Sequence, residues 1–343
     1  MQIDLLSDNV SGILPAVVMA FAEAGRGRAA PYGADSLTQG LDALFSDHFG
    51  TEVAVMLAST GTAANSLALS VMARPYEAIL CHERSHVQLR EAGAPEFFTQ
   101  GAKLVPLPGP AGLIDPAALE AELRGARAGR GQMLPYSVVS ITNPSDYGAV
   151  LGVRDLREIC DIAHAHGCRV HMDGARFPHA INALGVTPAE LSWQAGVDVL
   201  TYGGTKSGGY AAEAIVFFDR ALSANAKLLQ KRSGQTLSKM RFLSCQWQPL
   251  FEKGAIYAAA AQARQSAARL ARVVEDAGFA LTQPVEINMV FPRLPNAVID
   301  RLRAAGVTFL MREVGATDST IRFVTSFETT EEEIAGVAAA LRG

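Results

Sequence analysis

The sequence predicts an α/β protein with a large domain built on a mostly parallel sheet and a smaller C-terminal α/β domain. Two observations support this fold class. Apolar runs of strand length alternate with helix-like segments from about residue 50 to 218, as in a parallel sheet covered on both faces. After residue 219 the pattern changes to a long alanine-rich helix, expected over about 248–277, followed by short strand-like runs.

The chain ahead of the sheet is expected to form an arm and two helices. Residues 1–12 have the pattern of an extended arm. Pro15 opens a first helix that Gly25 closes, because proline suits the first helical turn. Asp35 can cap a second helix, whose apolar face continues to Phe49.

Buried strands are then expected at 53–57, 78–81, 104–105, 137–141, 169–172, 197–200 and 214–218. Helices are expected after Asp115-Pro116, over 154–166 and from Thr187-Pro188-Ala189-Glu190. In the C-terminal part, strand-like runs near 279–282, 286–292, 307–311 and 320–325 alternate with helices. Thr330 begins a capping-box pattern for the last helix.

Composition excludes several classes of protein. The net charge of −4 gives no electrostatic reason to bind nucleic acid or an anionic membrane. No apolar run approaches the ~20 residues of a membrane span, and the first residues do not resemble a signal peptide. The four cysteines form no Cys-x-x-Cys pair, which favours buried, reduced thiols in a cytoplasmic protein. His164 and His166 are spaced to lie on different helix faces, so no metal site is expected.

Two expected strand ends carry residues that suit cofactor chemistry. Lys206 ends the turn Gly203-Gly204-Thr205-Lys206, and Asp173 follows the strand at 169–172. Pyridoxal 5′-phosphate (PLP) chemistry needs such a pair, because a lysine forms the Schiff base and an aspartate keeps the pyridinium nitrogen protonated. Taken singly, each residue is better explained structurally, as a solvated lysine in a glycine-rich turn or as a helix-capping aspartate.

A third strand end offers a place for a phosphate. Gly61-Thr62 lies between an expected strand and helix, where free backbone N–H groups suit an anion. Neither a Walker A loop nor a Gly-x-Gly-x-x-Gly fingerprint is present, which argues against a nucleotide-binding protein. Because ligands bind beyond the carboxyl ends of the strands in open α/β sheets, Thr62, Asp173 and Lys206 are expected to converge there.

With these residues, the chain resembles the fold-type I PLP enzymes, and among them the bacterial low-specificity L-threonine aldolases and phenylserine aldolases. The resemblance covers nearly the whole chain, and Asp-Gly-Ala-Arg together with Gly-Gly-Thr-Lys is far more specific than either part. The matching stretches are Ser7-Asp8-Asn9, Tyr32-Gly33-Ala34-Asp35, Gly61-Thr62-Ala63-Ala64-Asn65, His86, residues 92–98, residues 172–177, Gly203-Gly204-Thr205-Lys206 and residues 239–243.

The resemblance implies a PLP-dependent transferase-like fold of type I and a role for each matching residue. The arm would span 1–12, the large PLP-binding domain 13–246 and the small domain 247–343. Lys206 would bind the cofactor covalently, and Asp173 would pair with its ring nitrogen. His86 would stack on the ring and move protons, with His82, Asp146 and water as rival bases. The implied phosphate ligands are Gly61, Thr62 and Thr205.

The resemblance also implies substrate and subunit contacts. Arg176 and Arg322 would bind the substrate carboxylate, with help from Ser7 on the arm. An arginine at 322 in an apolar strand needs an anion in any case, either a ligand carboxylate or a structural ion pair. In a homodimer or homotetramer, Lys231 would reach the cofactor phosphate of the neighbouring subunit, and Tyr32 would approach that subunit's substrate site. Spacing alone makes Lys231 a surface lysine.

One stretch departs from the family's pattern. Many threonine aldolases carry Asn-Thr-His after the strand that here ends at Ile141, whereas this chain has Thr142-Asn143-Pro144-Ser145-Asp146. The second histidine, linked to recognition of the β-hydroxyl group, is therefore missing. Asp146 could replace it, or the configuration at Cβ could be read loosely.

The implied reaction is retro-aldol cleavage of a β-hydroxy-α-amino acid, such as L-threonine, L-allo-threonine or phenylserine, to glycine and an aldehyde. A β-eliminating lyase or an aminotransferase-like enzyme would use the same lysine and aspartate, so these stay open as alternatives. A non-catalytic PLP-binding relative is disfavoured by the full set of carboxylate-binding residues.

Overall fold

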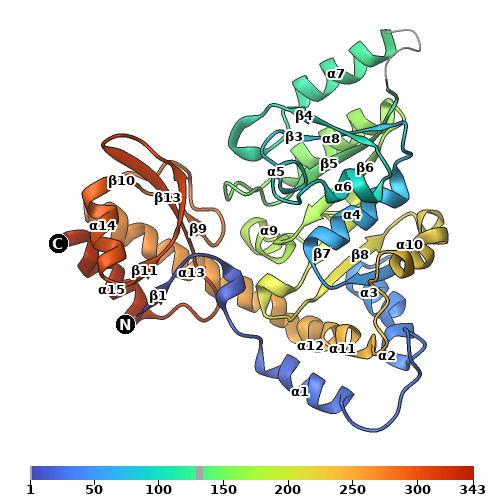
Figure 1. Cartoon of the computed structure of the whole chain (residues 1–343), viewed down its shortest axis with the longest axis horizontal. Helices are drawn as coiled ribbons and strands as arrows, with labels where there is room; N and C mark the ends of the chain where they lie inside the picture. The colour runs from blue at the N-terminus through green and yellow to red at the C-terminus, as the bar shows by residue number, and fades with distance from the viewer. Residues whose placement is uncertain (1, 129–133) are drawn as a thin grey trace.

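The computed structural model describes residues 2–128 and 134–343. Figure 1 shows a large lobe around one sheet and a smaller lobe, joined by the long helix α13 (Ala255–Asp276). Both chain ends lie in the smaller lobe. The residues from the two ends of the sequence are therefore close together in space.

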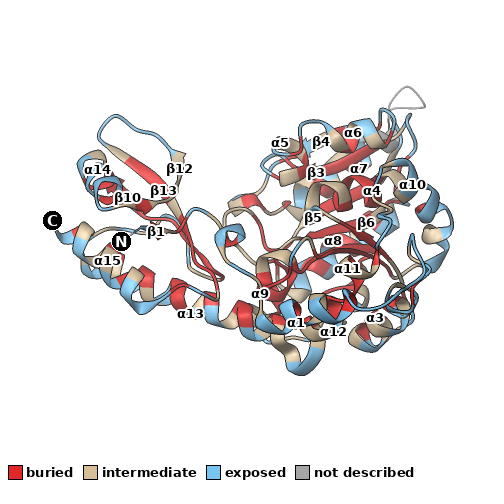
Figure 2. Ribbon diagram, turned by 60° about the horizontal axis from the view of Figure 1, so that its bottom comes forward, coloured by how far each residue is buried: buried red, intermediate tan, exposed pale blue. Residues whose placement is uncertain are grey.

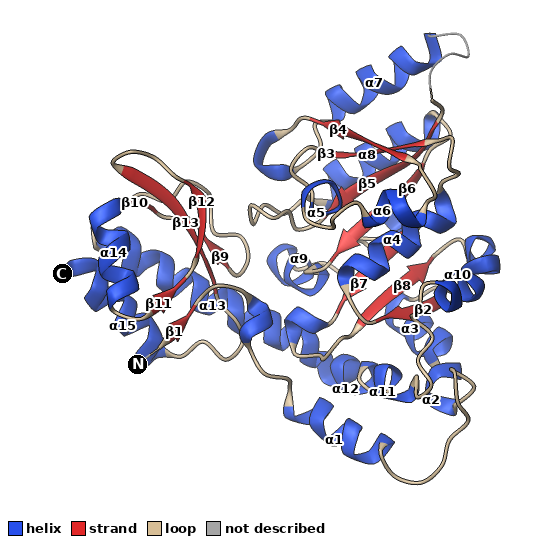
Figure 3. Cartoon of the chain, viewed as in Figure 1, coloured by secondary structure: helices blue, strands red, loops and turns tan. Residues whose placement is uncertain are grey.

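The large lobe contains a seven-stranded sheet in the order β2-β8-β7-β6-β5-β3-β4 (Figure 3). Its strands are β2 (Ala54–Ala58), β3 (Ala78–His82), β4 (Lys103–Leu107), β5 (Tyr136–Thr142), β6 (Arg169–Gly174), β7 (Val199–Gly203) and β8 (Glu213–Phe217). Strand β8 runs antiparallel to both neighbours, and the other pairs are parallel. The predicted mostly parallel sheet is confirmed.

Helices cover both faces of this sheet. The helices of the large lobe are α1 (Pro15–Ala24), α2 (Ser36–Gln39), α3 (Leu41–Phe49), α4 (Gly61–Met72), α5 (His86–Leu89), α6 (Ala94–Phe98), α7 (Pro116–Ala128), α8 (Val153–Ala165), α9 (Phe177–Leu184), α10 (Ala226–Arg232), α11 (Arg241–Ser244) and α12 (Trp247–Phe251). Phe45, Ile159 and Trp247 belong to one apolar core, and Leu67 to a second. Strand β7 is buried throughout, and its neighbour β6 is buried over nearly its whole length, as Figure 2 shows for β6. Apolar side chains there point to both covered faces of the sheet.

The smaller lobe combines the arm with the C-terminal segment. Strand β1 (Ile3–Asp4) pairs in parallel with β11 (Val307–Thr308). Beside this pair lie β9 (Met289–Val290), β10 (Arg293–Pro295), β12 (Leu310–Glu313) and β13 (Asp318–Val324), packed with α13, α14 (Asn296–Ala304) and α15 (Glu331–Arg342). The extended conformation expected for residues 1–12 is present in β1, but Asp8–Val10 forms a 3-10 turn instead. The capping box at Thr330 is confirmed.

Several local expectations were wrong or incomplete, and the strand-like run near 279–282 is reduced to a single bridge between Leu281 and Pro292. Thr187 and Glu190 exchange cap hydrogen bonds, but the expected helix is replaced by turns because Ser192 adopts φ −135° and ψ −107°. The long helix begins at Ala255 rather than 248, since Lys253 and Gly254 have left-handed backbone angles. The helix expected to run to Phe49 is interrupted at Gly40, and α9 was not predicted.

All four cysteines are buried and unpaired, as expected. Within residues 2–128 and 134–343, no helix has both the length and the apolarity needed to cross a membrane. The same residues contain no cluster of histidine, cysteine and carboxylate side chains suited to a metal ion.

Candidate active site

Lys206 lies in a short 3-10 turn, Thr205–Ser207, directly after β7. Position 203, the last residue of β7, requires glycine, because a Cβ there would be 2.6 Å from the carbonyl oxygen of Ala175. This close approach brings the ends of β6 and β7 together. Burial, followed by repulsion from Arg176, lowers the pKa of the Lys206 amine, although Asp8 and Asp173 oppose the shift.

The side chain of Lys206 faces a cavity of about 270 Å³ at the carboxyl ends of the parallel strands. Of the residues proposed from sequence, the structure places around it Lys206, Asp173, His86, Arg176, Gly61, Thr62, Thr205 and Asp146. The convergence expected from the three strand ends is therefore observed.

Asp173 is held at the end of β6 by two donors. Its Oδ1 accepts from the backbone N–H of Ala175 at 3.0 Å, and its Oδ2 accepts from Asn65 Nδ2 at 3.1 Å. The residue is buried. Its carboxylate therefore has a defined orientation in the cavity wall.

The two histidines of the loop after β3 differ in their surroundings. His86 opens α5, lines the cavity, and has its Nδ1 2.8 Å from Glu91 Oε1. In contrast, His82 accepts from the N–H of Arg84 through Nδ1 at 3.0 Å and contacts the Gly109 carbonyl oxygen through Nε2 at 3.1 Å. Both nitrogens of His82 are thus occupied by backbone groups away from Lys206.

The N-terminus of α4 forms the anion-accepting edge of the cavity. Thr60 caps the helix by accepting from Ala63 N–H, and Gly61 is its first residue. The first N–H groups of a helix lack acceptors within the helix, so they are available to an anion. No atom lies within 4 Å of a Cβ built on Gly61, which leaves room for close approach.

Thr205 is less available than its proposed role requires. Its hydroxyl donates to Glu213 Oε1 at 2.5 Å and accepts from Ala212 N–H at 3.0 Å. Glu213 is buried beside the cavity, and its Oε2 is without a hydrogen-bond partner among the described residues. Burial raises the pKa of this carboxyl to about 7.

The two arginines proposed to bind the substrate carboxylate differ in their hydrogen-bond partners. Arg176 forms a bidentate ion pair with Asp8, with Nε–Oδ2 at 2.6 Å and Nη2–Oδ1 at 2.9 Å. The Nε of Arg322, on β13, is buried without a partner in the described part of the chain. Burial, followed by repulsion from Arg176, lowers the pKa of Arg322 to about 10. Arg322 is therefore the guanidinium that still requires an anion.

Ser7 lies at the edge of this arrangement. It caps the short helical turn Asp8–Val10, and its hydroxyl is 3.5 Å from Asp8 Oδ1. Its neighbour Asn9, rather than Ser7, lines the cavity.

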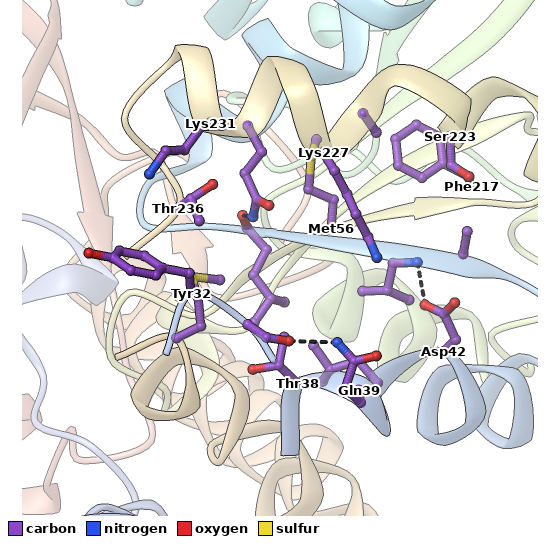
Figure 4. Close-up of a pocket in the computed structure, with 18 of the residues that line it drawn as sticks. Tyr32, Thr38, Gln39, Asp42, Met56, Phe217, Ser223, Lys227, Lys231 and Thr236 are labelled. Atoms are coloured by element: carbon purple, nitrogen blue, oxygen red, sulfur yellow. Dashed lines mark hydrogen bonds between the residues drawn. The ribbon is translucent and has the colours of Figure 1, made fainter. Parts of the chain in front are cut away.

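Tyr32 and Lys231 are not brought to the Lys206 cavity of their own chain. They line a second cavity, of about 490 Å³, between the α2–α3 region and α10. Figure 4 shows both side chains at one side of this cavity, with Lys227 and Thr38 further in. The Lys231 amine stands 4.8 Å from the centre of the Tyr32 ring, and Tyr32 is exposed.

No individual role was predicted for Asp8, Asn65, Glu91 or Glu213. Each is a buried polar residue next to a proposed site residue. A detectable signal existed for Glu213, which begins an apolar strand run, because buried carboxylates are rare without a function or a partner. Asn65 lies on a helix face whose burial was not foreseen.

Comparison with known proteins places the chain in a family. Residues 4–296 match the sequence profile of the family described as "Beta-eliminating lyase". The chain is 40% identical over 342 residues to a low specificity L-threonine aldolase of Pseudomonas aeruginosa, covering 98% of this chain and 96% of that protein. It is also 40% identical over 337 residues to the enzyme of the same description from a Pseudomonas species, with the same coverage.

A solved structure agrees with these sequence matches. A threonine aldolase of Leishmania major superimposes with a TM-score of 0.93 at 27% identity, over 99% of this chain and 98% of that chain. A putative L-allo-threonine aldolase of Listeria monocytogenes superimposes with a TM-score of 0.76 at 20% identity, covering 99% and 95%, which supports the fold alone. The chain thus belongs to the β-eliminating lyase family and, within it, to the low-specificity L-threonine aldolases.

Proposed function

We propose that this chain cleaves β-hydroxy-α-amino acids, with L-threonine, L-allo-threonine and phenylserine as candidate substrates, to glycine and an aldehyde. The observation that carries the proposal is a single cavity lined by the Lys206 amine, the Asp173 carboxylate and His86. Arg322 does not line it but interacts electrostatically with Arg176 and Asp146 of its wall, and its Nε has no partner among the described residues. These groups match an amino-acid substrate, which brings an amine, a carboxylate and a hydroxyl group.

The enzymes of this family use PLP, and the cavity fits this cofactor. The amine of Lys206 and the carboxylate of Asp173 face the same space, and the free N–H groups at the start of α4 suit the phosphate. Gly61 and Thr62 would hold that phosphate, whereas the Thr205 hydroxyl would have to leave Glu213 to donate to it. When bound, PLP withdraws electrons from the Cα atom of an attached amino acid.

Asp173 and Lys206 carry the core of the proposed chemistry. Asp173 would hold the proton on the ring nitrogen, because two fixed donors orient its carboxylate. Lys206 would bind the cofactor, and its lowered amine pKa favours the neutral, nucleophilic form.

His86 is proposed to remove the β-hydroxyl proton, directly or through water. Its ring lines the cavity, whereas both nitrogens of His82 are committed to the backbone. A general base needs such access to the proton that it removes. A His86→Ala enzyme that kept the full cleavage rate would refute this role.

Arg322 is proposed as the principal ligand of the substrate carboxylate, with Arg176 and Ser7 beside it. Arg176 offers less of its guanidinium, because Asp8 occupies its Nε and Nη2 edge. An Arg322→Lys enzyme should therefore show a raised KM, since lysine cannot bind a carboxylate in two parallel hydrogen bonds.

The proposed assembly is a homodimer or homotetramer in which Tyr32 and Lys231 serve the neighbouring subunit's site. Their exposure and their distance from the Lys206 cavity of their own chain support this arrangement. We also propose a cytoplasmic location, which four free, buried thiols favour. The proposed domain limits are 1–12, 13–246 and 247–343.

Product analysis tests the proposed function directly. Purified holoenzyme would be incubated with L-threonine, L-allo-threonine, phenylserine and their D-isomers, and glycine, aldehyde, keto acid and ammonia would be measured. Glycine and aldehyde in equal amounts are expected; keto acid with ammonia would indicate β-elimination, and keto acid with an aminated cofactor would indicate transamination. Borohydride should fix PLP on Lys206, and a protein that binds no PLP would overturn the proposal.

A further inference from the structure

A buried chain of hydrogen bonds joins His86 to Asp173 through two residues not yet used in the chemistry. His86 Nδ1 is 2.8 Å from Glu91 Oε1, and the same oxygen accepts from Asn65 Nδ2 at 2.9 Å. Asn65 Nδ2 also donates to Asp173 Oδ2 at 3.1 Å. The amide of Asn65 therefore bridges two carboxylates that would otherwise repel each other.

The local backbone explains why Glu91 meets His86. Helix α5 is a single turn, closed by the bond from Arg90 N–H to the His86 carbonyl at 2.8 Å. Ala92 and Gly93 then take positive φ angles of 53° and 74°, which turn the chain into α6. Glu91 is thereby held within hydrogen-bond distance of His86 Nδ1, with its side chain fully buried.

This geometry defines the protonation of the imidazole. An ionised carboxylate only accepts hydrogen bonds, so the ring proton belongs on Nδ1, facing Glu91. Burial raises the pKa of Glu91, whereas the hydrogen bonds from His86 and Asn65 oppose that shift and favour the ionised form. Nε2 is then left as the proton acceptor of a side chain that is 39% exposed.

Carboxylates around the ring also raise the pKa of His86, which favours a stronger base. The titratable groups facing His86 are Glu91 from the loop after α5, Asp173 from β6 and Asp146 from the loop after β5. The hydrogen bond to Glu91 is the largest influence and raises the pKa of His86, against the opposing effect of burial. A carboxylate paired with a histidine in this way makes the other ring nitrogen a stronger base.

We propose that Glu91 is a positioning residue that keeps the proton of His86 on Nδ1 and strengthens Nε2 as a base, and that Asn65 couples this pair to Asp173. The inference rests on the proposed function, because it assigns Nε2 to the β-hydroxyl proton. As a consequence, the proposed base His86 and the proposed ring-nitrogen partner Asp173 belong to one chain of hydrogen bonds.

The first test needs no substitution. Holoenzyme labelled with ¹⁵N-histidine would be titrated by NMR, and the His86 signals assigned by their loss in His86→Ala. The expected result is a proton on Nδ1 in the neutral ring. A neutral ring that carries its proton on Nε2 overturns the inference, whatever the catalytic activity.

The second test uses Glu91→Gln, with Glu96→Gln as a matched control five residues along. Glu91→Gln should lower the NMR pKa of His86 and reduce kcat about tenfold or more near pH 7, while PLP is retained. The low-pH limb of the kcat/KM profile should move by the same amount as the NMR pKa. Glu91→Asp should restore part of both values, and Glu96→Gln should change neither.

The outcomes separate this inference from the proposed function. Wild-type holoenzyme that releases no aldehyde refutes the aldolase proposal, whereas the NMR titration still decides the role of Glu91. Active enzyme in which Glu91→Gln leaves the His86 pKa and the pH profile unchanged refutes the inference alone. If Glu91→Gln does not fold, the wild-type ring proton and the Glu91→Asp profile decide it.

Discussion

Individual polar residues in the cavity wall have charge states set by their neighbours rather than by their type. Glu213 is the clearest case, because its buried carboxyl has one free oxygen and lies near Lys206. Asp146 is the opposite case: burial raises its pKa, but Arg176, His86, Lys206 and Arg322 outweigh burial and lower it. The first carboxyl should therefore gain a proton readily, and the second should stay ionised.

Glu213 should make the stability of the apoenzyme fall as pH rises. Its pKa is raised from 4.5 to about 7, so between these values the folded chain holds a proton that the unfolded chain has released. The stabilisation is complete below about pH 4.5 and is lost through about pH 7, amounting to about 3 kcal/mol. Urea unfolding at several pH values should show this slope in the wild type and a flatter curve in Glu213→Gln. The exposed control Glu275→Gln should keep the wild-type slope; equal slopes in all three proteins would contradict the assignment.

Asp146 should determine how strongly the enzyme discriminates between substrates that differ in configuration at Cβ. As an ionised acceptor in the cavity, it suits the hydroxyl of one diastereomer better than that of the other. Asp146→Ala should shift the ratio of kcat/KM for L-threonine and L-allo-threonine by roughly 10-fold or more, the value of a charged hydrogen bond. Steady-state kinetics would measure the ratio. Glu83→Ala, at an exposed carboxylate in the loop after β3, is the control. An unchanged ratio in Asp146→Ala would exclude Asp146 from this role.

At the scale of elements, the arm connects the smaller lobe to the active site. β1 is paired with β11, and four residues later Asp8 binds Arg176 at the end of β6. Asn288, from the smaller lobe, donates to the same Asp8 carboxylate at 3.0 Å. The arm therefore acts as a buried polar connection between the two lobes.

Asp8→Asn should strongly destabilise the protein and change KM, because Asp8 fixes the orientation of Arg176. The substitution removes the negative charge paired with buried Arg176, and breaking a buried ion pair costs on the order of 3–5 kcal/mol. Because Arg176 and Lys206 hold the pKa of Asp8 well below its usual range, its contribution persists above about pH 4 and is lost in acid. Denaturant unfolding and KM would be compared with Asp47→Asn, an exposed control. A decrease in the free energy of unfolding below about 1 kcal/mol would show that the Asp8–Arg176 pair contributes little to stability.

At the scale of the whole molecule, the chain has two separate sets of proposed site residues. Most of the proposed site residues line the Lys206 cavity, whereas Tyr32 and Lys231 line the other cavity and Ser7 and Arg322 line neither. A second copy of the chain would be needed to join the two sets in one site.

Subunit mixing should therefore restore activity. Lys206→Ala and Lys231→Ala are each expected to be strongly impaired. A mixed dimer would contain one site with both lysines intact. Random exchange makes half of the dimers mixed, so about a quarter of the wild-type activity should return. The rate would be measured before and after joint refolding, with Lys206→Ala plus Lys227→Ala as the control pair. No recovery would contradict a shared site.

Local sequence patterns determined a large part of this protein. Apolar runs separated by helix signals define the sheet, since each strand must bury both faces, and strand-end residues such as Asp173 and Lys206 can be identified from the order of residues alone. The helix break at Lys253-Gly254 escaped prediction because two consecutive left-handed residues override the helical pattern around them. The missing helix after Thr187 shows the same limit, since a correct cap does not ensure that the following backbone continues.

Tertiary structure alone decided which partners these residues have. The pairing of Asp8 with Arg176 joins residues 168 positions apart, and Asn65 lies 108 positions from Asp173. No local pattern encodes such contacts, because they arise only when strand ends converge and the arm folds back. The sequence determined which chemical groups are present; the fold determined which of them are neutralised, such as Arg176, and which remain free to bind a substrate, such as Arg322.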